Sequence, residues 1–346
     1  MRVELLDPDA ARWHETVAQL RHDFYHLPSY VRLVAAYDGG EPRAVYAEEG
    51  AGRLLVPLIV RRAGPGMLDG TSPYGYPGPL VSGPGPFARD VWPAVRERLR
   101  AEGLVSLFVR LHPLLNPDPP EEAGVVVEHG ETVSVDLRLP AEALWRQTVS
   151  GHRNEINRAV RAGHRVYVDT RWEHLPTFGR LYRATMQRLG AGAYYLFPDR
   201  YFEQLREALG DRLRLCVVDI GGAVAAAGLF AETDGIVQYH LSASDAAFTR
   251  DRPVKLLLHF VRGWAKARGN LRLHLGGGVG GRPDSLFRFK AGFSPARHPF
   301  RTLRVVLDEA AYAELVRAHD PTQDPTGLDG FFPLYRRPLA TASQPG

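Results

Sequence analysis

An order of elements that occurs twice is the feature that most constrains the fold of this chain. Apolar runs rich in Val, Ile and Leu predict strands, and helical periodicity predicts the helices between them. The first half has predicted strands at 43–48 and 54–61, a helix at 87–102 and a strand at 105–111; the second has strands at 213–220, 224–232 and 236–244, a helix at 253–268 and a strand at 271–275. A hairpin sheet followed by a helix and a strand, present twice, predicts an α+β fold of two tandem domains with a cleft between them.

The length of 346 residues suits two domains of roughly 150 residues each. We place the boundary at Pro140, because a predicted strand ends there and a long predicted helix begins. The expected domains are 1–140 and 141–320, followed by a Pro/Gly-rich tail at 321–346. Additional helices are predicted at 29–37, 141–162, 174–189 and 199–209, and additional strands at 132–139 and 302–307.

Composition indicates an ordinary globular protein, with 45% hydrophobic and 24% charged residues. The first ten residues have no apolar core, and no stretch approaches the ~20 apolar residues of a membrane helix. We therefore expect a cytoplasmic protein without an integral membrane segment. The single cysteine, Cys216, excludes an intramolecular disulfide and lies in an apolar run, so we expect a buried, inert thiol.

The segment with the most chemistry, 284–293, follows a glycine run at 276–281 and contains Phe289, Lys290 and Phe293. When an amine attacks an ester or thioester, the tetrahedral oxygen becomes anionic, and a fixed ammonium can stabilise it. An ammonium can equally pair with a phosphate of either substrate. The alternative is a solvated lysine beside core phenylalanines. The glycine run lacks the Gly-Lys-Ser/Thr ending of a P-loop, so we interpret it as a turn that brings Lys290 to the cleft.

This segment resembles the Phe-Lys-x-x-Phe signature of the Fem-like branch of the GNAT superfamily. Members of that family transfer amino acids from aminoacyl-tRNA onto peptidoglycan precursors. The resemblance covers residues 150–307 well and the N-terminal half loosely. It implies a degenerate GNAT-like domain at 1–140, a GNAT-like domain with the Phe-Lys motif at 141–320, and a place in the active site for Phe289 and Lys290.

The segment 150–163 is the most basic part of the chain and resembles the family's basic helix, which borders the substrate cleft. Arginine suits bidentate phosphate binding, so Arg153 is the candidate contact for a diphosphate or a tRNA phosphate, with Asn157 on an adjoining face. A charged, solvated helix face is the alternative interpretation of the same pattern.

The loop at 72–79 carries Tyr74 and Tyr76 between glycines and prolines that make it rigid. Family members have a Gly-Pro loop here, usually preceded by an arginine that this chain lacks, which puts a cell-wall acceptor in doubt. A structural turn and a ligand-facing loop both fit. Tyr25, His26 and Arg110 occupy positions where N-terminal cleft residues are expected.

His240, in a predicted central strand, is a candidate cleft residue, although a lone strand histidine is more often a hydrogen-bonded core residue. Enzymes that use acyl-CoA usually bind its pyrophosphate at a glycine-containing helix N-terminus. Here the corresponding residues, 249–255, contain a proline and no glycine. No metal is implied, because the histidines are scattered.

Three hypotheses follow. The first is an aminoacyltransferase that moves an amino acid from the acceptor end of aminoacyl-tRNA to a peptidoglycan precursor, a related peptide or a small amine. The second is an acyl-CoA-dependent or acyl-carrier-dependent N-acyltransferase acting on a sugar or small amine, and the third is a non-catalytic Fem-like binding module. Aminoacyl-tRNA or acyl-CoA is expected as co-substrate, with no resident cofactor. The sequence leaves the oligomeric state open.

Overall fold

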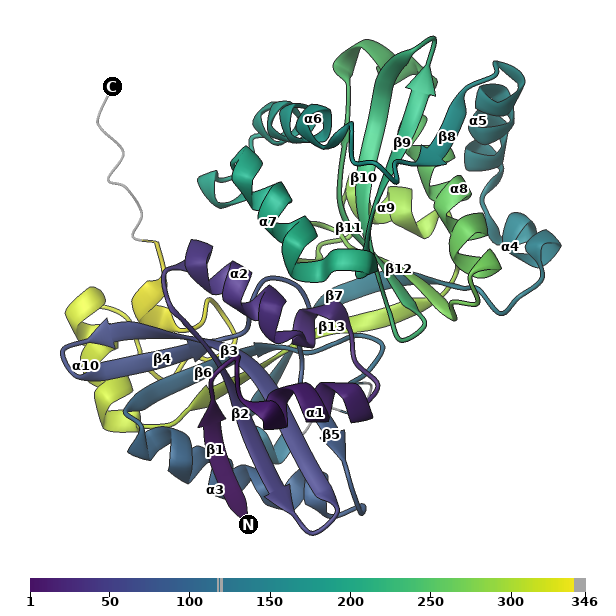
Figure 1. The fold of residues 1–346 in the computed structure, drawn as a ribbon. Helices are drawn as coiled ribbons and strands as arrows, with labels where there is room; N and C mark the ends of the chain where they lie inside the picture. The colour runs from purple at the N-terminus through teal and green to yellow at the C-terminus, as the bar shows by residue number, and fades with distance from the viewer. Residues whose placement is uncertain (117, 119–120, 339–346) are drawn as a thin grey trace, which may run out of the picture. The chain divides into compact units, whose positions relative to one another are not determined.

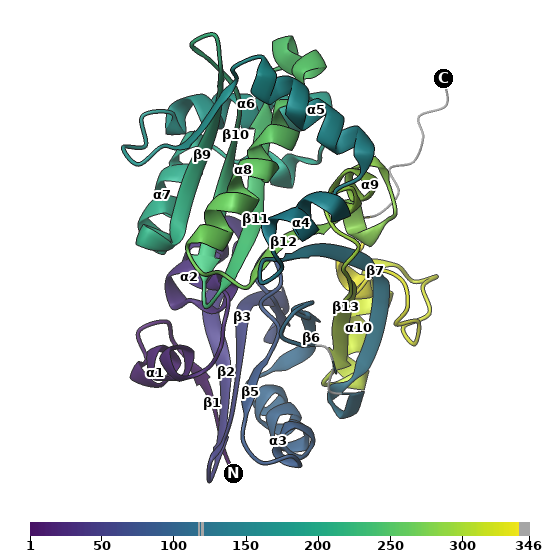
Figure 2. The same ribbon diagram turned by 90° about the vertical axis from the view of Figure 1, so that its right-hand side faces the viewer.

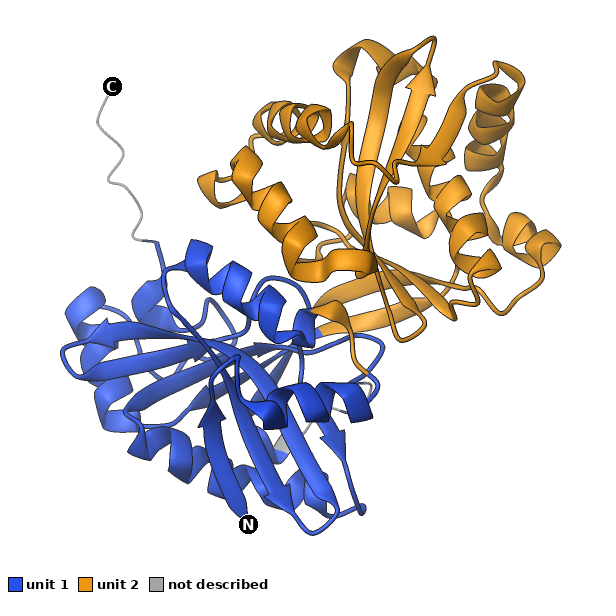
Figure 3. Cartoon of the chain, in the orientation of Figure 1, with its two compact units in different colours: residues 1–21, 25–128, 301–346 blue, residues 22–24, 129–300 orange. Residues whose placement is uncertain are grey.

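The computed structural model describes residues 1–116, 118 and 121–338, which divide into two compact units (Figure 3). Unit 1 comprises residues 1–21, 25–128 and those from Arg301 onward, and unit 2 comprises residues 22–24 and 129–300. The chain passes from unit 1 to unit 2 after Glu128, and not at residue 140 as predicted. Residues 301–320, which we predicted to be part of the second domain, fold with unit 1 because Thr302 to Val306 pair with a strand of that unit.

The described residues of unit 1 form a mixed sheet and four α-helices (Figure 1). Its elements are β1 (Arg2–Leu6), α1 (Ala11–Gln19), α2 (Pro28–Asp38), β2 (Glu41–Glu49), β3 (Gly52–Gly64), β4 (Met67–Thr71), β5 (Leu80–Ser82), α3 (Phe87–Ala101), β6 (Leu104–Arg110), the C-terminal part of β13 (Arg297–Val306) and α10 (Glu309–His319). Within the unit the strand order is β1-β2-β3-β4-β6-β13, with β5 also paired to β3. Only the β4–β6 pair is parallel among these described ladders.

Unit 2 has the same kind of sheet. Its elements are most of β7 (Val125–Asp136), α4 (Ala141–Gln147), α5 (Ser150–Arg161), β8 (Arg165–Val168), α6 (Leu175–Arg188), α7 (Asp199–Leu209), β9 (Leu213–Ile220), β10 (Ala223–Thr233), β11 (Ile236–Ser244), α8 (Pro253–Ala267), β12 (Arg272–Gly277) and α9 (Ser285–Ala291). The strand order is β7-β12-β11-β10-β9-β8, and the β11–β12 pair is parallel. No helix in the described part of the chain is both long and apolar enough to cross a membrane.

The two sheets confirm the predicted duplication at the level of topology. The order β1-β2-β3-β4-β6-β13 corresponds strand by strand to β8-β9-β10-β11-β12-β7. In each unit a three-strand meander is followed by a crossover helix, α3 or α8, and by a strand parallel to the last one of the meander. Parallel strands need such a crossover, so the helix and the parallel pair occur together.

Successive side chains along each strand point to opposite faces of the sheet, and in unit 2 both faces are buried. Cys216 and Val218 of β9 pack in one core cluster with Leu257 and Val261 of α8. Helices α6 and α7 lie on the opposite face (Figures 1 and 2). The expected burial of the thiol is confirmed, because Cys216 is fully buried, and burial raises its pKa to about 12.

The structure corrects the predicted helix at 141–162, which is two helices, α4 and α5. The break lies at Thr148 and Val149, whose backbones are extended. The guanidinium of Arg262 is buried beneath this corner and donates to the carbonyl of Leu144 (3.1 Å) and the hydroxyl of Thr148 (2.7 Å). Helical periodicity alone does not reveal this break, because the residue that stabilises it comes from α8. The short strands β1, β4 and β8 were also not predicted.

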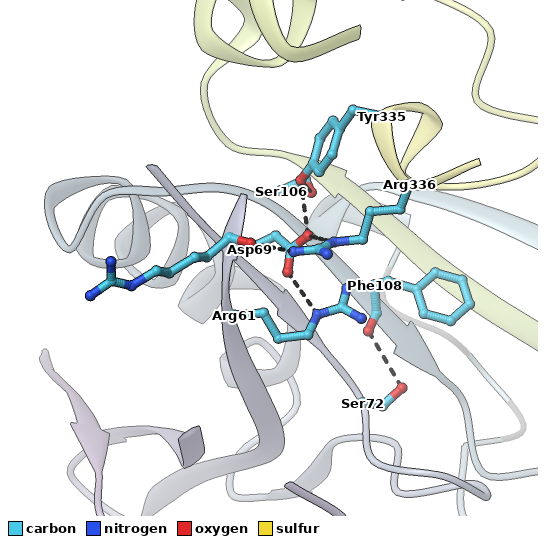
Figure 4. A network of polar contacts seen from close by, with 8 residues as sticks. Arg61, Asp69, Ser72, Ser106, Phe108, Tyr335 and Arg336 are labelled. Atoms are coloured by element: carbon cyan, nitrogen blue, oxygen red, sulfur yellow. Dashed lines mark hydrogen bonds and ion pairs between the residues drawn. The ribbon is translucent and has the colours of Figure 1, made fainter. Parts of the chain in front are cut away.

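The C-terminal tail at 321–338 packs on unit 1 through a buried carboxylate (Figure 4). Asp69, in the middle of β4 and 1% exposed, accepts hydrogen bonds from Arg61 Nε (2.9 Å), from the Arg336 guanidinium and from the Tyr335 hydroxyl (3.3 Å). Tyr335 also bonds to Ser106 (2.7 Å), and burial raises its pKa far above the usual range. A carboxylate with these partners holds three chain segments together.

Replacing Asp69 with asparagine removes the charge that pairs two arginines, so Asp69→Asn should lower the free energy of unfolding by about 2 kcal/mol or more. Urea denaturation followed by tryptophan fluorescence measures the change. The matched control is Glu97→Gln on the exposed side of α3, which should stay within about 0.5 kcal/mol of the unaltered protein. Equal stability of the two variants would show that the Asp69 contacts are dispensable.

Candidate functional site

Strands β11 and β12 form a short parallel ladder that ends in the middle of unit 2. Their described pairs run from Ile236–Arg272 to Gln238–His274. Beyond that point β11 continues beside β10 and β12 continues beside β7. The two strands therefore separate after Gln238 and His274, and the residues that follow in each strand are no longer bonded to the other strand.

Lys290 spans this separation. Its Nζ donates to the carbonyl oxygen of Gly277 on β12 (2.7 Å) and lies 5.8 Å from the ring centroid of Tyr239 on β11. We call Tyr239, Gly277 and Lys290 the strand fork. The structure thus places the most strongly predicted site residue where the ladder between two central strands ends.

The glycine run and α9 position Lys290. Asp284 caps α9, its carboxylate accepting from the backbone N–H of Phe287 (2.8 Å) and of Val279 (2.9 Å). Gly278 must lack a side chain, because a Cβ there would lie 2.0 Å from the carbonyl oxygen of Arg282. The run is therefore a tightly packed turn, as predicted, and Asp284 joins it to the helix that carries the lysine.

The Lys290 ammonium is in an unusual environment for lysine. The side chain is 8% exposed, and burial lowers its pKa to about 8, an effect that the Asp284 carboxylate partly offsets. Below that pH the ammonium persists; above it the amine is neutral. The alternative of a solvated lysine is excluded by this burial.

Phe289 plays a different part from its neighbour. Its ring packs with those of His152 (5.6 Å between centroids) and Phe293 (5.7 Å) in the core of unit 2. Its carbonyl oxygen accepts from Nε2 of His152 (2.9 Å), whose pKa is lowered by burial. Phe289 therefore holds α9 against α5, and the geometry gives its side chain no direct part in the chemistry.

Arg153, predicted to contact a phosphate, uses one nitrogen of its guanidinium for contacts within the protein. Its Nη1 donates to the carbonyl oxygens of Thr148 and Arg146 (3.2 Å for the latter), which are at the C-terminal end of α4. The side chain thus satisfies carbonyls that a helix end leaves unpaired. Asn157 lies on the exposed face of α5. Neither residue contacts the strand fork in the described hydrogen bonds.

His240 follows Tyr239 on β11 and packs edge-to-face on Phe24, with 5.2 Å between ring centroids. Burial lowers its pKa to about 4, so its imidazole is neutral near pH 7. This agrees with the interpretation of His240 as a core residue.

Gln238 belongs to a buried polar chain at the end of the ladder, and its partners in that chain were not predicted. Gln238 Nε2 donates to Asp23 Oδ2 (2.6 Å), and its Oε1 accepts from His274 Nδ1 (2.7 Å). All three side chains are buried. Gln238 stands out in the sequence as a polar residue in an apolar strand, but its partners are remote in sequence.

Three of the candidates in unit 1, Tyr25, His26 and Tyr76, lie in one aromatic cluster, and Tyr74 is bonded to it through its backbone. The rings of Tyr25 and Tyr76 meet edge-to-face (6.0 Å), and His26 stacks on His112 (6.2 Å). The carbonyl oxygen of Tyr74 accepts from Tyr30, which itself packs on Tyr25. Unit 1 therefore has its own grouped set of aromatic and imidazole side chains, which includes His112, a residue that was not predicted.

Arg110 bonds to the loop at 72–79, which carries part of this cluster. Its Nη1 donates to the carbonyl oxygen of Ser72 (3.2 Å), and its guanidinium lies 5.1 Å from the ring of Phe108. Gly75 has a φ of +106°, and a Cβ there would lie 2.0 Å from the Tyr25 ring. The loop is thus fixed by close packing, and Arg110 positions it.

Two cavities lie away from the strand fork. One of about 560 Å³ in unit 1 is bordered by Arg21, Arg89, Asn116 and Glu122 among others, and one of about 310 Å³ in unit 2 lies beside β8. Neither is lined by a predicted site residue. The strand fork is the candidate site, because its buried lysine has defined contacts and a lowered pKa. The described residues contain no group of three or more His, Cys, Asp or Glu side chains arranged to bind a metal.

The contacts of Arg153 make a stability prediction. Arg153→Ala removes charge-assisted hydrogen bonds to carbonyls at the end of α4, so the free energy of unfolding should fall by about 1 to 2 kcal/mol. Asn157→Ala, on the exposed face of the same helix, should change it by less than about 0.5 kcal/mol. Chemical denaturation of both variants tests this. If Arg153→Ala leaves the free energy of unfolding unaltered, the contacts of Arg153 within the protein are dispensable and its guanidinium is free to bind a ligand.

Comparisons with known proteins concern the fold. Residues 146–290 match the model of the acetyltransferase (GNAT) domain. The structure of FemX is similar over 91% of this chain and 99% of its own, with a TM-score of 0.69 and 13% identity. A conserved protein of unknown function from Bacteroides thetaiotaomicron gives a TM-score of 0.58 at 13% identity, covering 88% and 100% of the two chains.

The C-terminal domain of a putative lysylphosphatidylglycerol synthetase from Agrobacterium fabrum gives a TM-score of 0.56 at 15% identity, covering 87% of this chain and 93% of its own. No curated protein matches the sequence. The Fem-like resemblance is confirmed at the level of the fold, and the GNAT match supports an acyltransferase. The chain thus has the fold of FemX, and its residues 146–290 are similar to the acetyltransferase (GNAT) domain.

Proposed function

We propose that this protein is an N-acyltransferase whose chemistry takes place at the strand fork of unit 2. The observation that carries the proposal is the Lys290 ammonium, buried where β11 and β12 separate and within the residues that match the GNAT domain. Burying the charge of a lysine costs folding free energy. Buried groups with shifted pKa values are found preferentially at functional sites. This argues against the third hypothesis, a non-catalytic binding module.

The reaction needs little from the protein besides positioning and charge. An amine attacks the carbonyl carbon of an activated ester or thioester, a C–N bond forms, and the carbonyl oxygen becomes anionic. The Lys290 ammonium stabilises that oxyanion. The C–O or C–S bond then breaks, and the alcohol or thiol leaves with a proton derived from the amine. His240 is not assigned as a base, because its lowered pKa makes it a weak proton acceptor near pH 7.

For the donor we propose aminoacyl-tRNA, with a peptidoglycan precursor or a related peptide as acceptor, in the cytoplasm. The N-terminus of α8 supports this, because it begins with Pro253 after Arg252, a residue with φ of +51°. Proline lacks a backbone donor, and the turn has no glycine to let a pyrophosphate approach. The likeness to FemX supports the same class.

The second candidate keeps the reaction and changes the donor to acyl-CoA. The match of residues 146–290 to an acetyltransferase domain favours it. The two candidates differ in one measurable respect, which is the donor from which label moves to the acceptor.

Lys290→Ala should reduce transfer at least tenfold, a loss of about 1.4 kcal/mol of transition-state stabilisation. The assay offers a labelled pool of charged tRNAs or labelled acetyl-CoA, each with cell-wall nucleotide precursors and small amines as acceptors. The matched control is Lys266→Ala, because Lys266 also donates to a backbone carbonyl, that of Leu137 (2.9 Å), but on α8. Its activity should be unchanged.

Label that moves from tRNA and depends on Lys290 would support the aminoacyltransferase. Transfer from acetyl-CoA alone would exclude it and support the second candidate. Full activity in Lys290→Ala would refute the proposed role of the fork, whichever donor is used.

A further inference from the structure

The chain uses lysine very sparingly. Lys and Arg total 43, but only Lys255, Lys266 and Lys290 are lysines, which leaves 40 arginines. Arginine stays charged in proteins, whereas the ammonium of a buried lysine can lose its proton. Lys290 is the most deeply buried of the three lysines. Because burial disfavours the charged form of Lys290, groups around its side chain must favour that form if the ammonium is to persist.

Tyr239 is the side chain that faces the ammonium from β11. Its ring stacks on Phe230 of the neighbouring strand, with 5.5 Å between centroids and 19° between planes, and its hydroxyl bonds to Ser242. These contacts hold the ring in one orientation, 5.8 Å from Lys290 Nζ. Burial raises the phenol pKa to about 12, so the group is neutral and the ring face is what the ammonium meets.

The other charged or titratable groups on the elements around α9 are already engaged. Asp284 accepts two backbone N–H groups, and Arg288 donates to the carbonyl of Pro283 (3.0 Å). On α5, His152 donates to Phe289, and burial disfavours its charged form. On β12, His274 is bonded to Gln238. Besides the Gly277 carbonyl oxygen, which accepts from Nζ, Asp284 is the charged group that favours the Lys290 ammonium.

We propose that Tyr239 is a positioning residue, whose ring face keeps Lys290 charged and directed into the strand fork. A cation beside an aromatic face is attracted by the ring quadrupole, and the attraction is larger when both groups are shielded from water. The consequence for catalysis rests on the proposed function, because the ammonium is the form that stabilises an oxyanion. The charge state itself is independent of that function.

The small number of lysines permits a direct test. Protein labelled with [ε-¹³C]lysine has three Cε signals, which Lys255→Arg and Lys266→Arg variants assign. Titration of the whole protein then gives the pKa of Lys290. In Tyr239→Leu this pKa should fall by about one unit, because loss of the ring disfavours the charged form. Tyr239→Phe keeps the ring and should leave the pKa close to that of the unaltered protein.

A second ring-free variant, Tyr239→Met, should lower the pKa as Leu does and serves if Tyr239→Leu does not fold. The Lys255 and Lys266 signals report whether each variant is folded. An unchanged Lys290 pKa in the folded ring-free variants would overturn the inference. So would an equal fall in Tyr239→Phe, because the hydroxyl and not the ring would then be responsible.

Activity separates this inference from the proposed function. Where transfer is observed, its loss at high pH should begin about one pH unit lower in Tyr239→Leu and at the same pH in Tyr239→Phe, as the neutral amine replaces the ammonium. If the pKa falls as expected but the unaltered protein transfers no acyl group, the inference about Tyr239 holds and the proposed function fails.

Discussion

The parallel pair β11–β12 is the constraint on which the rest of the site depends. Two parallel strands cannot be joined by a tight turn, so α8 must cross the sheet between them, and it packs its apolar face on Cys216 and Val218. The ladder lasts for three residue pairs because each strand then follows a different neighbour. The polar groups that follow in each strand become available to a third element, and α9 supplies Lys290 there.

The same topology in unit 1 gives a different result. Strands β4 and β6 are also parallel and joined by a crossover helix, α3. Within this ladder Asp69 pairs with Ser106, and its carboxylate is bonded to Arg61, Arg336 and Tyr335. A duplicated sheet thus holds a buried lysine with a shifted pKa in one unit and a fully paired buried carboxylate in the other. Buried charge is costly in both, and the difference lies in whether it is neutralised by partners.

Sequence patterns predicted the large elements well because those elements have strong apolar periodicity. The meander β9-β10-β11, the helix α8 and the strand β12 all occur where alternation and helical spacing placed them. The short strands β1, β4 and β8 were missed because a few residues carry too little periodicity. The break between α4 and α5 was missed because it depends on Arg262, more than a hundred residues away.

Among site residues, the motif around Lys290 was found because its residue types are unusual together, and the glycine run before it was interpreted correctly as a turn. Arg153 shows the opposite case. Its place in a basic helix suggested a phosphate contact, but the guanidinium caps α4, because the α4–α5 corner brings the carbonyls of Arg146 and Thr148 within its reach.

What the sequence by itself determined is the duplicated order of elements, the choice of Lys290 as the candidate site residue and the burial of Cys216. These follow from local periodicity and residue chemistry. Only the tertiary structure decided that the Lys290 ammonium meets the Gly277 carbonyl and the Tyr239 ring, and that Gln238 joins Asp23 to His274. The reason is physical: the pKa of a lysine and the partners of a polar side chain depend on burial and on residues distant in sequence, which chain order alone does not specify.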